Sequence, residues 1–161
     1  MLMIWFGVEK MQNMTSVFGG AGFIGSRFVE MYKDSCKIIP RNDRDTRSNE
    51  ILYLISTTHN YNVFEDLHKD VVTNLTTMLE MLDKLKSRQD KDKITVNFVS
   101  SWFVYGDSAG RPTKEIDRCD PRGFYAITKK CAEDLLISFC NTFGLKYRIF
   151  RLSNVYGPGD K

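Results

Sequence analysis

"TSVFGGAGFIGSRFVEM", residues 15–31, decides the fold of this chain. A short apolar run leads into three glycines at three-residue spacing, and a helical pattern follows them. Glycine is needed where the backbone turns sharply and where a phosphate must approach the main chain. The N-terminus of the following helix offers free N–H groups to such a phosphate. We therefore predict a dinucleotide site in this turn. The residues expected there are Gly19, Gly22, Phe23, Ile24 and Gly25.

Apolar runs and helical patterns alternate along the rest of the chain. Further strands are predicted near 36–40, 50–57, 93–101 and 146–154, and the last one is expected to be buried over Tyr147–Leu152. Long helices are predicted over 66–86 and 123–143, with Gly144 as the residue that ends the second. Such alternation is typical of an α/β fold, a doubly wound (Rossmann) parallel sheet of about five strands with helices on both faces. Right-handed crossovers favour the strand order 2-1-3-4-5.

The chain has 161 residues, of which 42% are hydrophobic, and a net charge of +3. This length and composition indicate one globular domain. We assign residues 1–12 to an N-terminal extension and 13–161 to the domain. The sequence has no uninterrupted block of basic residues of the kind that binds nucleic acid. The apolar segment at the start of the chain is too short to span a membrane. The four cysteines lack metal-ligand spacing, so we expect no metal site and reduced thiols in a cytoplasmic protein.

A tyrosine and a lysine stand four residues apart in "GFYAITKK", residues 123–130. On a helix this spacing places Tyr125 and Lys129 on the same face. A free tyrosine has a pKa of about 10, and a nearby ammonium group favours the phenolate. The pair therefore suits an acid/base catalyst with its activator, although the same spacing also arises by chance on many helices.

The glycine turn "GGAGFIGS" resembles the fingerprint of the extended short-chain dehydrogenase/reductase family, the NAD-dependent epimerase/dehydratase group that mostly acts on nucleotide sugars. The resemblance extends from Thr15 to the last residue. In "FVSSWFVYGD", residues 98–107, the register of the Val-Tyr-Gly motif makes Ser101 the match for the family's catalytic serine. The resemblance implies that Ser101, Tyr125 and Lys129 are the catalytic residues. It also implies that Asn74 helps to order the active site.

The two residues after this serine narrow the reaction that the resemblance implies. Family dehydratases carry an Asp-Glu pair there and the decarboxylases a Glu, whereas this chain has Trp102 and Phe103, which transfer no protons. An NAD(P)-dependent epimerase or ketoreductase acting on a nucleotide sugar remains, with Ser101, Trp102 and Asn154 expected at the substrate. The alternative is a non-catalytic NAD(P)-binding sensor or scaffold.

The cofactor choice depends on the end of the second predicted strand, where an acid is typical of NAD and an arginine of NADP. If Arg41 takes the acid's place, NADP is favoured; if Pro40 shifts the loop, Asp43 takes it and NAD is favoured. We prefer NADP. Thr57, after the third strand, is also expected beside the cofactor, together with Tyr125 and Lys129. Only a short loop separates the second and third strands, so the adenine side of the site should be abbreviated.

This chain ends in an Asn-x-Tyr-Gly-Pro motif, residues 154–158. In the family, this motif is where the chain leaves the dinucleotide domain. We therefore expect the chain to be an N-terminal portion whose substrate domain is missing, with little activity alone. The resemblance also implies a homodimer through helices 66–86 and 123–143. The apolar stripe which that packing requires is suggested by Met78, Met81 and Leu85.

Overall fold

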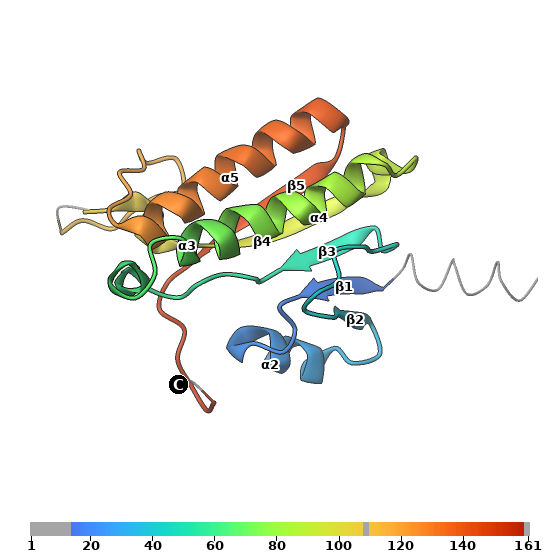
Figure 1. Ribbon diagram of the computed structural model, residues 1–161, viewed down its shortest axis with the longest axis horizontal. Helices are drawn as coiled ribbons and strands as arrows, with labels where there is room; N and C mark the ends of the chain where they lie inside the picture. The colour runs from blue at the N-terminus through green and yellow to red at the C-terminus, as the bar shows by residue number, and fades with distance from the viewer. Residues whose placement is uncertain (1–13, 108–109, 160–161) are drawn as a thin grey trace, which may run out of the picture.

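A computed structural model describes residues 14–107 and 110–159, so the predicted extension 1–12 lies outside the described residues. These residues form a parallel five-stranded sheet (Figure 1). Its strands are β1 (Thr15–Phe18), β2 (Cys36–Ile39), β3 (Glu50–Tyr53), β4 (Thr95–Ser101) and β5 (Lys146–Leu152). They lie in the order β2-β1-β3-β4-β5, which confirms the predicted fold class and strand order.

Helices cover both faces of the sheet: α2 lies on one side, and α4 and α5 lie on the other (Figure 1). The predicted helix 66–86 begins three residues late and contains a π-helical turn, while the predicted helix 123–143 is continuous. Gly144 ends that helix in the left-handed conformation. The helical elements are α2 (Phe23–Met31), η1 (Asn60–Phe64), α3 (Lys69–Val71), η2 (Val72–Thr76), α4 (Thr77–Lys86), η3 (Lys91–Lys93), η4 (Trp102–Tyr105) and α5 (Phe124–Phe143).

The hydrophobic core lies between the sheet and the pair α4–α5. It includes Met78, Met81, Leu82, Leu85, Val96, Phe98, Leu136 and Cys140. The prediction of a buried last strand is wrong, because β5 is an edge strand and Tyr147 and Phe150 are exposed. An edge strand has a sheet neighbour on one side only, so a hydrophobic run there is less covered than the same run in β3 or β4.

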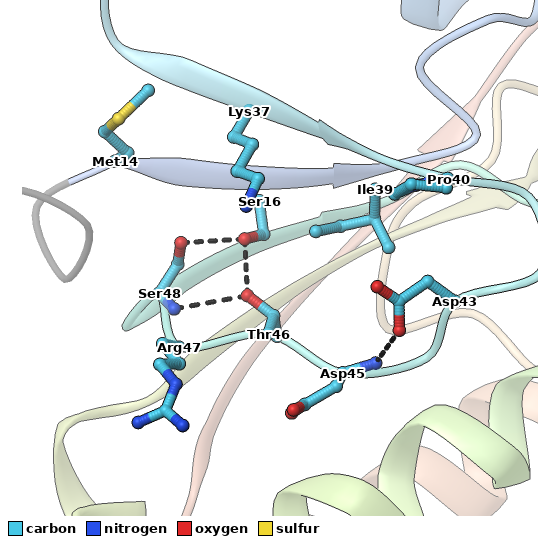
Figure 2. A pocket seen from close by; sticks show the side chains of 10 residues that line it. All are labelled: Met14, Ser16, Lys37, Ile39, Pro40, Asp43, Asp45, Thr46, Arg47 and Ser48. Carbon is cyan, nitrogen blue, oxygen red and sulfur yellow. Dashed lines mark hydrogen bonds between the residues drawn. The ribbon is translucent and has the colours of Figure 1, made fainter. Parts of the chain in front are cut away.

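Ten residues without a helix, 40–49, connect β2 to β3. Parallel strands are normally joined by longer, helical crossovers, so this loop must obtain its stability from polar contacts. The buried hydroxyl of Ser16 on β1 bonds to Thr46 and donates to Ser48 at 2.7 Å (Figure 2). The loop and the sheet edge enclose a cavity of about 180 Å³. Its lining is Met14, Ser16, Lys37, Ile39, Pro40, Asp43, Asp45, Thr46, Arg47 and Ser48.

Two arginines form hydrogen bonds that stabilise this crossover loop. Arg44 donates to Glu80 on α4 at 2.9 Å and to two carbonyls of its own loop. Arg88 donates to the carbonyls of Thr46 and Ser48 and forms an ion pair with Asp90 at 2.7 Å. The abbreviated connection is therefore an ordered part of the fold. Among the helices of the described segments, none has the length and apolar character needed to cross a membrane.

Candidate active site

The glycine turn between β1 and α2 leaves the backbone open at the start of the helix. Gly19 adopts a φ of +81°, and a Cβ there would lie 3.0 Å from the amide nitrogen of Ile55. Gly25 is buried, and a Cβ on it would lie 2.2 Å from the carbonyl oxygen of Gly19. Gly22 is exposed at the N-cap of α2, which has neither a side-chain cap nor an acidic residue in its first turn. This free positive helix end suits a phosphate group.

The remaining predicted cofactor residues surround this turn at different depths. Phe23 and Ile24, at the start of α2, are half-buried, and Thr57, beyond β3, is buried. Arg41 and Asp43 follow β2 and are both exposed. Asp43 accepts a hydrogen bond from the backbone N–H of Asp45 and lines the cavity in Figure 2. That cavity lies against β1 and β2, and no predicted catalytic residue lines it.

The predicted catalytic residues lie on adjacent elements. Ser101 is the last residue of β4, while Tyr125 and Lys129 lie on successive turns of α5, and all three are buried. Ser101 Oγ accepts the N–H of Phe103 at 3.3 Å. The ring of Phe103 meets the ring of Tyr125 edge-on, with 5.8 Å between centroids. Phe103 therefore connects the end of β4 to the first turn of α5.

Lys129 has an unusual environment for an ammonium group. Only 1% of the residue is exposed, and its Nζ donates to the carbonyl oxygen of Val99 at 2.7 Å. The same nitrogen lies 4.2 Å from the ring centroid of Phe98. Burial lowers the pKa of Lys129 to about 7, and the charge of Glu133 opposes that shift. A lysine that titrates near neutral pH and lies one helical turn from a tyrosine can assist proton transfer.

Two of the three residues predicted at the substrate, Trp102 and Asn154, contact each other. The Trp102 indole donates to Asn154 Oδ1 at 3.2 Å, which joins η4 to the segment after β5. Both residues are exposed. The Trp102 ring also packs on Phe103, with 4.6 Å between centroids. An exposed aromatic surface therefore lies directly beside Ser101.

A buried polar network connects the β3 end to α5, and most of it escaped the sequence analysis. Asn74 accepts the Thr57 backbone N–H and donates to the hydroxyls of Thr57 and Thr128, each at 2.9 Å. Asp70 accepts from Thr57 and from Asn62. Asn74 lies within the π-helical turn η2, and such turns occur frequently at functional sites. The resemblance identified Asn74, whereas the polar partners Asp70, Asn62 and Thr128 gave no periodic signal.

Asn60 is a further residue that the sequence analysis missed. Its Oδ1 accepts the backbone N–H of Ala126 at 3.3 Å, and its Nδ2 donates to the Arg122 carbonyl. Asn60 therefore caps the first turn of α5 from a distant part of the chain, next to Tyr125. Gly123 has a φ of +84°, which strains any other residue, and a Cβ on it would also lie 2.5 Å from this amide oxygen. The exposed His59 precedes η1, and its side chain accepts the N–H of Tyr61.

Residues 44–161 match the model of the NAD dependent epimerase/dehydratase family, which is more than half of the chain. GDP-6-deoxy-D-mannose reductase of Pseudomonas aeruginosa is 32% identical over 113 residues, covering 69% of this chain and 36% of that protein.

Two solved structures, each a complex with a nicotinamide dinucleotide, have the same fold. RMD from Pseudomonas aeruginosa, complexed with NADPH, has a TM-score of 0.78 at 26% identity and covers 94% of this chain and 56% of its own. UDP-glucose 4-epimerase from Thermus thermophilus, in complex with NAD, has a TM-score of 0.80 at 25% identity over 92% and 57%. The chain thus spans about a third to just over half of these proteins. By the match of its sequence and of its fold, the chain belongs to the NAD dependent epimerase/dehydratase family.

Proposed function

We propose that residues 13–161 form the dinucleotide-binding domain of an NAD(P)-dependent epimerase or ketoreductase that acts on a nucleotide sugar. The observation that carries this proposal is the buried group of Ser101, Tyr125 and Lys129 at the junction of β4 and α5. The open N-terminus of α2 supports a dinucleotide partner. Among the relatives, one is named as a reductase and another as a 4-epimerase, so both reactions remain candidates.

In this proposal the chain's own residues position and move one proton. The Ser101 hydroxyl oxygen already accepts the Phe103 N–H, so its own proton is available for the reacting sugar oxygen. Tyr125 exchanges a proton with that oxygen, and the Lys129 ammonium group stabilises the phenolate that forms. Trp102 and Asn154 form the exposed wall on which the substrate would rest. A nicotinamide, when bound, supplies the hydride chemistry. The turn Gly19–Gly25, with Thr57, would hold that cofactor.

We propose NADP as the preferred cofactor because Arg41 is exposed and its side chain forms no hydrogen bond or ion pair within residues 14–107 and 110–159. Its guanidinium group is free to take a 2′-phosphate, whereas the Asp43 carboxylate already accepts an N–H from Asp45. We expect NADPH to bind at least about tenfold more tightly than NADH, the effect of one charge-assisted phosphate contact. Intrinsic fluorescence and thermal shift of the full chain measure both affinities.

Matched arginine variants separate this contact from general charge. Arg41→Ala should bring the NADPH affinity down to that of NADH, while Arg47→Ala, an exposed arginine of the same loop, should leave the ratio unchanged. If NADH binds more tightly than NADPH, the ribose contact belongs to Asp43 and not to Arg41. Absence of binding of either cofactor at millimolar concentration would refute the dinucleotide site.

The exposed apolar residues of the long helices support a homodimer, although not through the residues predicted. Met78, Met81 and Leu85 are fully buried in the core, so they cannot form the second stripe. The exposed apolar residues on these helices include Val71, Val72, Leu79 and Ile127. Exposed apolar side chains on two neighbouring helices favour association with a second copy.

Sedimentation of the full chain tests the proposed dimer. We expect a dimer for the unchanged chain and a monomer for Val72→Glu, because a charge in an apolar helix contact is poorly solvated. Ile116→Glu is the matched control: Ile116 is 91% exposed and belongs to neither helix, so its variant should remain dimeric. A monomeric unchanged chain would contradict the proposal.

The second candidate is a non-catalytic NAD(P)-binding module. The observation in its favour is the ten-residue crossover after β2, which leaves little protein on the adenosine side of the site. Such a module would bind the dinucleotide without requiring the proton transfer assigned to Tyr125. Tyr125→Phe should leave cofactor affinity within about twofold in both cases. If the chain is an enzyme, the same variant should also reduce turnover by about 100-fold or more, whereas a non-catalytic module has no turnover to lose.

A further inference from the structure

Glu133 is a fully buried carboxylate to which the proposed reaction gives no role. It lies on α5 one turn beyond Lys129, on the same face of the helix, and only 1% of it is exposed. Its two oxygens accept hydrogen bonds from Nε and Nη2 of Arg151, at 3.0 Å and 2.8 Å. A buried ion pair rarely stabilises a fold more than apolar residues of the same volume would. Its position beside a buried lysine therefore calls for a functional reason.

Arg151 connects this carboxylate to both catalytic elements. It lies on β5, with its guanidinium carbon 4.7 Å from the ring centroid of Tyr105, the last residue of η4. Its Nη1 also donates to the carbonyl of Glu115, in the segment that precedes α5. One side chain therefore contacts α5 and the turn that follows Ser101.

We propose that Glu133 and Arg151 are positioning residues that act through Lys129: Glu133 is the counter-charge of the buried ammonium group, and Arg151 draws that carboxylate away from a direct pair with it. This inference rests on the proposed roles of Tyr125 and Lys129. Among the described residues Glu133 forms its ion pair with Arg151 and none with Lys129. The lysine is left with the Val99 carbonyl and the Phe98 ring. It feels the carboxylate through space without being neutralised by it.

The other titratable groups around the lysine are few. Strand β4 has no charged side chain, and Asp70 on α3 is already bonded to Thr57 and Asn62. Tyr125 lies on the same helix, and Arg151 is the only charged residue of β5 bonded to Glu133 in the described segments. Around Arg151 the remaining groups are Tyr105 and Cys119, which act on the arginine. Glu133 is the charged group that acts on the pKa of Lys129, against the effect of burial.

Titration of Lys129 in the full chain, without any dinucleotide, tests this inference. The readout is the ¹³C chemical shift of its ε-carbon between pH 5 and 10, assigned as the signal missing from Lys129→Met. We expect Glu133→Gln to lower the midpoint by about one unit, because the counter-charge is lost. Arg151→Gln should raise it by about one unit, because the freed carboxylate then attracts the ammonium group.

Opposite signs are what distinguish a charge effect from a merely structural one. Loosened packing admits water and would raise the midpoint in both variants, which would overturn the proposal, as would no change in either. Asp134→Asn removes an exposed acid of the same helix, paired with Lys130, and should leave the midpoint unchanged. If Glu133→Gln does not fold, Arg151→Lys takes its place: it keeps the charge, so its midpoint should remain below that of Arg151→Gln. Cofactor affinity of the unchanged chain, measured separately, tests the proposed function itself.

Discussion

Replacing Gly25 by alanine should abolish dinucleotide binding. The added Cβ would lie 2.2 Å from the carbonyl oxygen of Gly19 and 2.8 Å from the Cα of Gly20. Both contacts are to backbone atoms, so α2 must move away from the turn. A displacement of about 1 Å at a positioned site costs about 100-fold, and we expect at least that loss of affinity for NADPH and NADH. Overpacking should also lower the free energy of unfolding by about 1–3 kcal/mol.

A second glycine separates the loss of the site from the loss of stability. Gly144→Ala changes a residue with a φ of +77° and no atom within 4 Å of the added Cβ. It should cost about 1 kcal/mol of stability, because alanine is strained in this region. It lies beyond the end of α5 opposite to Tyr125, so cofactor affinity should be unchanged. Wild-type affinity in folded Gly25→Ala would remove the glycine turn from the proposed site.

The fold was predictable because its signals are local. Glycine spacing after a short apolar run located β1 and α2, and the strands alternate with helical periodicity along the chain. Strand order then followed from crossover rules and was correct. Burial was harder to predict, since Tyr147 in edge strand β5 and Val17 in β1 occupy similar sequence patterns but only Val17 is buried. Position in the sheet, which no local pattern encodes, decides which face is covered.

The polar partners of the site were not predictable for the same reason. Asn60 caps α5 across 66 positions of sequence, and Asn74 reaches Thr128 across 54. Single asparagines carry no periodicity, so only a family motif could identify one of them. The crossover contact of Ser16 with Thr46 and Ser48 likewise joins a strand to a loop of irregular structure. Sequence patterns locate elements, whereas these contacts depend on how the elements are placed together.

Lys129→Met should make the protein more stable at low and neutral pH. The lysine is 1% exposed, and burial lowers its pKa to about 7 from the ordinary value of 10.5. Below the folded-state pKa the ammonium group is charged in both states, so the folded chain carries the full cost of a buried charge. Between the two values the unfolded chain binds more protons, so stability rises with pH. Methionine fills the same volume without a charge and removes that cost.

The expected size and its control follow from the same linkage. Each unit of the interval between pH 7 and 10.5 contributes up to about 1.4 kcal/mol, so the variant should exceed the wild type by several kcal/mol at pH 6 and by less at pH 8.5. Urea unfolding at these pH values measures the difference. Lys130→Met is the matched control: Lys130 pairs with Asp134 at the surface, and its variant should differ from the wild type by a constant amount.

The unfolding free energies of Lys129→Met and of the wild type should converge as the pH rises, while those of Lys130→Met and the wild type stay parallel. This result would show that the fold bears a cost for keeping this ammonium group beside Tyr125. Proteins retain such costs where activity requires them, because a destabilised group in an active site is poised to react. Parallel curves for both variants would mean that Lys129 titrates as an ordinary lysine. In that case it could not serve as the near-neutral group of the proposed site, and the Glu133–Arg151 pair would have no lysine to regulate.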